Sequence, residues 1–405
     1  MMTNSALSAP RDTESTAEYT VRVRRALHSW PETGIDNPRT QQFIVDELSA
    51  IEGVEVRHGN RGTSVVARLR TGRPGGTALL RADTDALPVA EDSGEDFASQ
   101  VPGTCHACGH DAHVAMLLGA ARLLAARREE LCGDILLVFQ PGEEGHDGAR
   151  ALLADEAFAD LLTPESVTQS FAIHITPNLP SGAVFSRAGT LMASTDGLAI
   201  ELRGKGGHAA LPQLSANPVP PLADLAFRLS SGAIHAGAGK KSEDALVTVT
   251  ALSAGSTHNV IPDSGRLLFT LRCLDEASRQ LSLSRIRAAA EAVGDGVSAE
   301  LSSLVSYPCT VNHAEAVRTA REAVTGLPAL AWQELPAPVM TAEDFSYFLE
   351  KWPGCMVLLG ACPPDVVDPA TAAACHSPQM RLDESVLASG AALHAAVAAA
   401  ICSRR

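Results

Sequence analysis

The sequence between residues 105 and 113, which reads CHACGHDAH, concentrates thiol and imidazole groups where a predicted loop passes into a helix. Cysteine thiolate and neutral histidine are the ligands that borderline-soft divalent metals prefer in proteins. Cys108 and His110, separated by one residue, could bind the same ion, whereas His113 falls in the first helical turn and could simply face a sheet. The segment indicates a metal site. A Cys/His-rich loop with internal hydrogen bonds is the alternative.

Two adjacent carboxylates, Glu143 and Glu144, follow an apolar run that predicts a buried strand. Open α/β sheets bind their ligands at the carboxyl ends of the strands, which is where this pair lies. One carboxylate can bind a metal while its neighbour works as general acid and base. A solvated surface pair is the alternative when the two residues are considered alone.

Two more histidines and a pair of acids extend this picture. His174 emerges from an apolar strand, and His376 lies in the sequence CHSP near the C-terminus. Alone, either one would more often be a core or loop histidine than a ligand. Together with the first two motifs they form a set of one cysteine, three histidines and a glutamate, enough for one or two metal ions. Asp83 and Asp85 leave another strand at the same edge, where they would either orient metal ligands or cap a turn.

The middle of the chain offers a histidine and an arginine. The sequence GKGGH at 204–208 lets the backbone turn sharply and present His208, but it lacks the spacing of a phosphate-binding loop. Arg272 is predicted on a strand, where a buried guanidinium needs an anion. Its planar donor fork suits a substrate carboxylate, and an internal ion pair is the alternative. The sequence contains no His-Glu-x-x-His run, Walker loop or dinucleotide fingerprint.

The helices and strands that must position these residues follow two different patterns along the chain. From about residue 21 to 190, continuous apolar strands alternate with helices, which is typical of a mainly parallel sheet. This part predicts strands at 65–69, 77–81, 134–139 and 170–175, and helices at 112–127 and 149–160. The next part predicts strands at 198–203, 245–253, 266–274 and 298–305, and helices at 217–230 and 277–292. Its order is βαββαβ, the ferredoxin-like arrangement.

One α/β domain, interrupted by a second domain inserted into it, accounts for both patterns. Residues 1–194 and 307–405 would form an α/β catalytic domain whose mixed, mainly parallel sheet is flanked by helices. Residues 195–306 would form a smaller inserted α+β domain. The chain would end in an alanine-rich helix at 384–401.

Composition excludes several classes of function. The chain has 405 residues, 45% of them hydrophobic, and a formal net charge of −15, which argues against nucleic acid and anionic lipid as partners. The first twenty residues lack the apolar core of an export signal, and the apolar stretches fall short of the roughly 20 residues that span a membrane. Nine scattered cysteines in such a chain indicate free thiols in a reducing cytoplasm.

As an ordered set, these motifs resemble the metal-dependent aminoacylase and carboxypeptidase family. The resemblance is greatest to the branch of hippurate hydrolase, indole-3-acetyl-amino acid hydrolase and bacterial N-acyl-amino acid aminoacylases. It covers nearly the whole chain, starting at RALH, 25–28. Its motifs are RADTDALP at 81–88, ACGHD at 107–111, FQPGEE at 139–144, His208, NVIP at 259–262, EDF at 343–345 and CHSP at 375–378.

The resemblance implies a role for each matching position. Five residues match the family's metal ligands, namely Cys108, His110, Glu144, His174 and His376. Glu143 matches the general base, and Asp85 matches an acid that orients the site from behind. His208 matches a residue that reaches an active site, often that of the partner subunit. Asn259 and Arg272 match the pair that holds the substrate carboxylate, and the inserted domain matches a lid and dimerisation domain.

The implied function is metal-dependent hydrolysis of the amide bond of small-molecule N-acyl amino acids. The enzyme would use one or two divalent ions per subunit, Zn²⁺ or Mn²⁺ with Co²⁺ as a further option, and would be a cytoplasmic homodimer without nucleic-acid or membrane partners. A dipeptidase with the same machinery and a non-catalytic ligand-binding relative are the alternatives. The intact Glu143 argues against the latter.

Three positions depart from the family's commonest pattern. Gly142 stands where alanine is usual and Thr84 where methionine is usual, and both lie beside the metal site. Cys375 replaces a larger apolar residue and adds a thiol next to His376. The first two departures bear on substrate range rather than on the chemistry.

Overall fold

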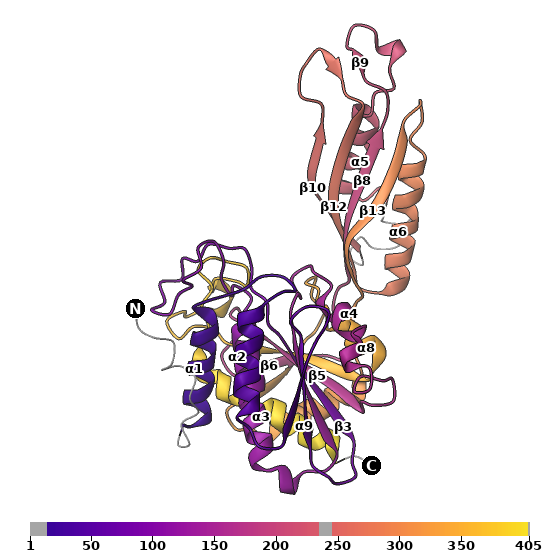
Figure 1. The fold of residues 1–405 in the computed structure, drawn as a ribbon. Coiled ribbons are helices and arrows are strands. Elements are labelled where there is room, and N and C mark those ends of the chain that lie inside the picture. Colours follow the sequence, from indigo (N-terminus) through magenta and orange to yellow (C-terminus); the bar gives the residue numbers. More distant parts are fainter. Residues whose placement is uncertain (1–13, 235–244, 404–405) are drawn as a thin grey trace. The chain divides into compact units, whose positions relative to one another are not determined.

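The computed structural model describes residues 14–234 and 245–403. Contacts divide them into two compact units (Figure 1). The first unit holds the residues up to Gly189, then Val311–Pro336, and the chain from Tyr347 onward. The second unit holds Thr190–Thr310 and Ala337–Ser346, and the predicted insertion 195–306 falls within it.

An eight-stranded mixed sheet forms the centre of the first unit, in the order β1-β2-β4-β3-β5-β16-β6-β15. Its strands are β1 Val54–His58, β2 Val65–Arg70, β3 Thr77–Asp83, β4 Asp134–Gln140, β5 Gln169–Thr176, β6 Ala183–Ser186, β15 Ala331–Glu334 and β16 Gly354–Gly360. The central pairs β4–β3, β3–β5 and β5–β16 are parallel, whereas β1–β2, β2–β4 and β16–β6 are antiparallel. The predicted mixed, mainly parallel sheet is therefore confirmed.

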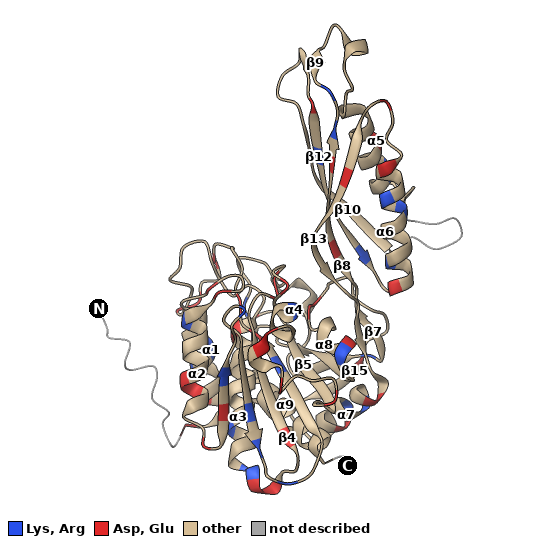
Figure 2. Cartoon of the chain, turned by 45° about the vertical axis from the view of Figure 1, so that its right-hand side comes forward, with Lys and Arg blue, Asp and Glu red and all other residues tan. Residues whose placement is uncertain are grey.

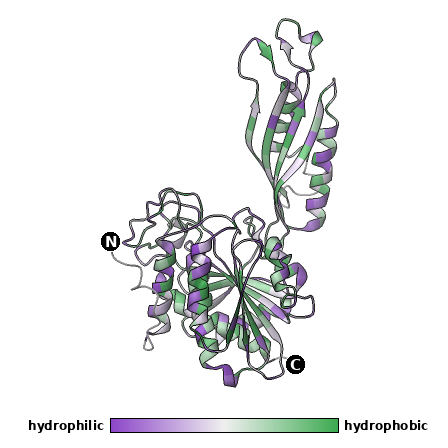
Figure 3. Ribbon diagram, viewed as in Figure 1, coloured by the Kyte–Doolittle hydropathy of each residue, from purple (hydrophilic) through white to green (hydrophobic). Residues whose placement is uncertain are grey.

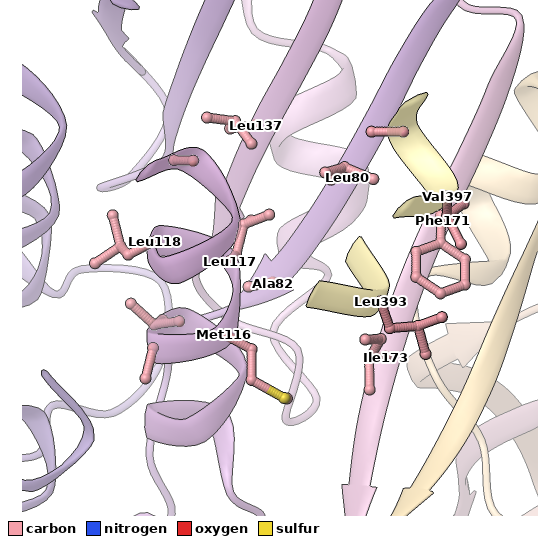
Figure 4. Close-up of a cluster of buried hydrophobic side chains, with 14 of the residues drawn as sticks. Leu80, Ala82, Met116, Leu117, Leu118, Leu137, Phe171, Ile173, Leu393 and Val397 are labelled. Carbon is pink, nitrogen blue, oxygen red and sulfur yellow. The ribbon is translucent and has the colours of Figure 1, made fainter. Parts of the chain in front are cut away.

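Helices cover this sheet and share its core. The main ones are α1 Thr16–His28, α2 Pro38–Ser49, α3 His110–Ala126, α7 Ala314–Thr325 and α9 Leu387–Cys402. In Figure 4, Leu117 of α3 and Leu393 of α9 lie among apolar side chains of the strands, such as Leu80 and Phe171. Strands β3 and β4 are buried along nearly their whole length, which explains the apolar runs Ala78–Leu80 and Ile135–Phe139 (Figure 3).

The expectation that every apolar stretch is too short to span a membrane was wrong for one helix. By length and composition alone, Glu384–Cys402 could cross a membrane, so the chain does contain an apolar stretch long enough. In the structure, α9 packs against α3, α7 and the sheet, and Leu393 and Val397 are buried in the core. This is the position of a core helix.

The segment predicted as one helix at 149–160 is divided. Helix α4, Gly148–Leu153, ends early, and a separate short 3₁₀ turn follows. The cause is Asp155, whose buried carboxylate accepts the backbone N–H groups of Asn60 and Arg61 at 2.6 and 2.7 Å. The same carboxylate also accepts the N–H of Ala157 at 2.9 Å and caps the 3₁₀ turn, and such a local bond from an aspartate side chain competes with continuation of the helix.

The second unit contains a four-stranded antiparallel sheet in the order β10-β12-β8-β13. The strands are β8 Thr195–Arg203, β10 Ala245–Ala254, β12 Ser264–Cys273 and β13 Ser298–Tyr307. Helices α5 Val219–Ser230 and α6 Glu276–Glu291 pack on it, and α6 exposes both acidic and basic residues (Figure 2). The chain order is βαββαβ, so the ferredoxin-like prediction is confirmed.

Candidate metal centre and active site

The five predicted metal ligands gather at the carboxyl edge of the parallel strands of the first unit. The donor atoms of Cys108, His110 and His174 lie within 4.8 Å of one another. Those of Cys108, Glu144 and His376 form a second such group. Glu143 joins His110 and Glu144 in a third. The loops after β3 and β4, strand β5 itself, the start of α3 and the loop before α9 thus bring distant residues into one cluster.

Hydrogen bonds orient the histidine rings for metal binding. The Nδ1 of His110 donates to the carbonyl oxygen of Asp85 at 2.8 Å, and the Nδ1 of His174 donates to the carbonyl oxygen of Ile175 at 2.7 Å. Each ring therefore keeps its Nε2 lone pair for a metal, an arrangement common in metal sites. The Nε2 of His110 is buried and has no hydrogen-bond partner among the described residues. The Nε2 of His174 lies 3.5 Å from the Sγ of Cys108.

Left-handed backbone conformations occur between two of these donors, at Gly109, and at the donor residue His376. Gly109, φ +82°, begins α3, and a Cβ there would lie 2.6 Å from the side chain of Ile175. Only glycine fits this position between Cys108 and His110. His376 itself has φ 71°, and its N–H donates to the carbonyl oxygen of Ala107 at 2.7 Å. Strain at a non-glycine residue costs of order 1–3 kcal/mol and is concentrated at functional sites.

Asp85 connects Glu143, the predicted base, with two of the predicted ligands, Glu144 and His110. Its carboxylate accepts the backbone N–H groups of Glu143 and Glu144 at 3.0 and 3.1 Å. Its own carbonyl oxygen accepts from His110, and the residue is buried. Asp85 thereby holds the Glu143–Glu144 turn against the start of α3.

The cluster is strongly negative. Burial opposes protonation of His110, but the carboxylates of Asp83, Asp85 and Glu144 outweigh it and raise its pKa well above the ordinary histidine value. Burial opposes ionisation of Glu144, but hydrogen bonding to His376 outweighs it and lowers its pKa. This potential attracts cations. The donor set of one thiol, three imidazoles and one carboxylate fits a borderline divalent ion.

Two neighbours of the cluster were not assigned a role from the sequence. The thiols of Cys375 and Cys108 share a hydrogen bond. This bond is the largest influence on the pKa of Cys375, which is lowered to about 6. Asp111, the residue after His110, is fully buried and lies 2.7 Å from the Nδ1 of His28. Burial opposes protonation of His28, but Asp111 outweighs it and raises the His28 pKa to about 9. The signal for Asp111 was an acid at the start of an otherwise apolar helix.

The three remaining predicted site residues all lie in the second unit. The short strands β9 Gly207–His208 and β11 Val260–Ile261 pair and bring exposed His208 next to Asn259, whose carbonyl oxygen accepts the N–H of Ala209 at 3.1 Å. Arg272 is half-buried on β12, and its Nη1 donates to the carbonyl oxygen of Met340 at 3.1 Å. It forms no ion pair with an acid in the described chain, and burial lowers its pKa. The internal ion pair considered from the sequence is therefore not observed.

Comparisons with known proteins agree on one family. The pattern of peptidase family M20/M25/M40 matches residues 79–400. Thermostable carboxypeptidase 1 of Saccharolobus solfataricus is 34% identical over 395 residues, covering 96% of each chain. IAA-amino acid hydrolase ILR1-like 2 of Arabidopsis thaliana is 35% identical over 393 residues, covering 94% of this chain and 84% of that protein. N-acetylcysteine deacetylase of Bacillus subtilis is 35% identical over 345 residues, covering 84% of this chain and 87% of that protein.

A solved structure gives the same result. A Bacillus subtilis protein described as a dinuclear metal binding peptidase of the M20 family superimposes with a TM-score of 0.78 at 31% identity. The alignment covers 95% of this chain and 97% of that one. The similarity thus includes both units of the chain.

Proposed function

Because this chain belongs to peptidase family M20/M25/M40, whose members similar to it are hydrolases of amide bonds, we propose that it cleaves N-acyl amino acids into a carboxylic acid and an amino acid. The observation that carries this proposal is the cluster of five metal-binding side chains with Glu143 beside it. A screen of N-acyl amino acids that varies the acyl group tests it directly. Failure to hydrolyse any of them would contradict it.

Cys108, His110, Glu144, His174 and His376 would hold one or two divalent cations. The thiolate favours Zn²⁺, and Mn²⁺ and Co²⁺ suit the imidazoles and the carboxylate. When bound, such a cation lowers the pKa of coordinated water and polarises a carbonyl oxygen.

Glu143 would act as the base and then as the acid. Its carboxylate takes a proton from the attacking water, whose oxygen bonds to the amide carbon. It then delivers this proton to the leaving nitrogen as the carbon–nitrogen bond breaks. Asp85 fixes the backbone of Glu143 through its N–H, which limits the positions that the Glu143 side chain can take before the reaction.

The second unit would supply the groups that recognise substrate. His208 would stabilise the oxyanion, and Asn259 and Arg272 would bind the carboxylate of the amino acid. The half-buried guanidinium of Arg272, without an acidic partner in the described chain, supports this role.

Arg272→Ala is expected to lower kcat/KM about 10–100-fold for free-acid substrates, mainly through KM, because a charge-assisted hydrogen bond contributes roughly 1.5–3 kcal/mol. The matching substrate amides, which lack the negative charge, should be affected far less. Steady-state kinetics on both series measure this difference. Arg266→Ala, an exposed arginine on the same strand, is the control. Equal losses on acids and amides would mean that Arg272 has a structural role.

We further propose a homodimer in which His208 of one subunit serves the site of the other. The edge strands β10 and β13 of the second unit expose Leu246, Leu252 and Leu304, which suits pairing with a second copy.

Mixing two inactive variants tests the shared site. Glu143→Gln and His208→Ala would be purified separately and combined under conditions that exchange subunits. If the site is shared, random exchange at equal amounts restores about one quarter of wild-type activity, because half of the dimers then hold one intact site of two. No recovery, or a monomer by light scattering, would contradict the shared site.

A peptidase is the second candidate, because two similar proteins are named thermostable carboxypeptidases. N-acetylated and free-amino dipeptides with the same C-terminal residue distinguish the two. Faster cleavage of the free-amino peptides would favour the peptidase.

We propose a cytoplasmic location as well. All nine cysteines lie within the described residues and all are free thiols. Free thiols persist in reducing compartments. Fractionation of cells that make the protein tests this.

A further inference from the structure

The sheet of the first unit opens between β3 and β5 below the metal cluster. The parallel ladder between these strands ends at Arg81 and Ala172. Strand β5 continues to Thr176, paired on its other side with β16. A backbone N–H of β5 that faces β3 beyond this point needs another acceptor, because a buried N–H without a partner is costly.

His113 closes this opening with its side chain. Its Nε2 accepts the N–H of Ile175 at 2.8 Å, and its Nδ1 donates to Asp83 Oδ1 at 2.5 Å. Asp83 is the last residue of β3. The imidazole thus joins the ends of two strands where the ladder between them has stopped. Both ring nitrogens of His113 take part in hydrogen bonds, so His113 is not a metal ligand. This holds although the potential donor atoms of Asp83, His110 and His113 lie within 4.8 Å of one another.

His113 and Asp83 lie against two of the three predicted histidine ligands, His110 and His174. The His113 ring stacks on that of His110, with centroids 5.4 Å apart and planes at 27°. It meets the ring of His174 edge-on at 5.0 Å. Asp83 Oδ2 lies 3.5 Å from the Nε2 of His110 and is held by Arg81 Nη1 at 2.8 Å. His113 is buried, so its ring is held in place between the rings of His110 and His174.

We propose that His113 and Asp83 are positioning residues of the metal centre, which set the spacing and ring orientation of His110 and His174 by bridging the split between β3 and β5. The inference rests on the proposed metal centre. It explains why this histidine of the CHACGHDAH segment lies close to the cluster without joining it.

Cobalt titration of His113→Phe tests the inference. Phenylalanine keeps the ring volume but loses both hydrogen bonds. We expect the dissociation constant of Co²⁺ for the metal-free protein to rise about 10–100-fold, as when outer residues of metal sites are removed. The visible absorption bands of bound Co²⁺ should change as well, because the ligand geometry relaxes. A purely structural histidine would leave these bands unchanged.

His394→Phe is the matched control. His394 is a buried histidine of α9 whose ring meets Phe171 edge-on at 5.3 Å, and it belongs to none of the donor groups. Its replacement should leave Co²⁺ affinity and spectrum as in the wild type, even if the melting temperature changes. Affinity within threefold of wild type in both variants overturns the proposal.

A second variant keeps the proposal testable if His113→Phe does not fold. Asp83→Asn preserves shape but removes the charge that binds Arg81 and His113, and it should weaken Co²⁺ binding at least tenfold. Unchanged affinity in this variant also overturns the positioning role. Absence of Co²⁺ binding by the wild type would overturn the metal centre itself, so the two failures are distinguishable.

Discussion

Glu143→Gln is expected to lower kcat by about 10²–10⁴ while the protein keeps its fold and its metal. The amide is nearly isosteric with the carboxylate but cannot take a proton from water. The backbone N–H that binds Asp85 is unchanged by the substitution, so the turn that holds residue 143 should persist. Bound metal by elemental analysis and turnover of one substrate should be measured on the same sample.

Glu130→Gln serves as control, since Glu130 is an exposed residue of the same unit, placed next to Arg127 on the surface. It should leave kcat unchanged. A wild-type rate for Glu143→Gln with full metal content would contradict the role of Glu143 as base.

Removal of the metal is expected to have the other large effect, a loss of activity of at least about 10²-fold, because water is then no longer activated. Burial opposes protonation of His110, but without a cation the carboxylates of Asp83, Asp85 and Glu144 outweigh it and raise the pKa of His110, so this ring favours a proton in place of the metal. Activity should return on addition of Zn²⁺, Mn²⁺ or Co²⁺, and the extent of recovery ranks these ions. Full activity in thoroughly metal-free protein would contradict the mechanism.

The same experiment separates a ligand from its neighbour. Cys108→Ala should lower the bound metal itself, because it removes a donor atom common to two of the donor groups. Cys105→Ala replaces an equally buried thiol three residues earlier that belongs to no donor group. Its metal content should equal that of the wild type. Equal losses in both variants would indicate disruption of the loop rather than of the metal centre.

Much of the fold could be predicted because its signals are local. A strand buried on both faces, such as β3 or β4, needs an apolar run in its sequence. In β12 of the second unit, buried residues alternate with more exposed ones, as expected for a strand with one buried face. The placement of Glu143 and Glu144 at a strand end followed from the same pattern. The break at Asp155 did not, because two of the N–H groups that its carboxylate binds belong to residues about 95 positions earlier.

The site was predicted in composition more fully than in geometry. Residue types and a family resemblance name the donors, but they do not show which nitrogen of His110 is free. The role of His113 depends on where β3 ends relative to β5, a register that no local pattern encodes. The contact of Cys375 with Cys108 depends likewise on a loop near the other end of the chain.

The exposure of His376, whose backbone is left-handed, bears on how fast the proposed metal centre would release an ion. Its side chain is 56% exposed, whereas that of Glu144, which it touches, is 14% exposed and Cys108 is buried. Among the five predicted ligands, His376 is thus the one that water reaches most readily, and its left-handed backbone is held by the bond from its N–H to Ala107. If these five residues bind an ion as proposed, water would reach the bond to His376 first, so the lifetime of the loaded centre would depend on the loop that carries this residue.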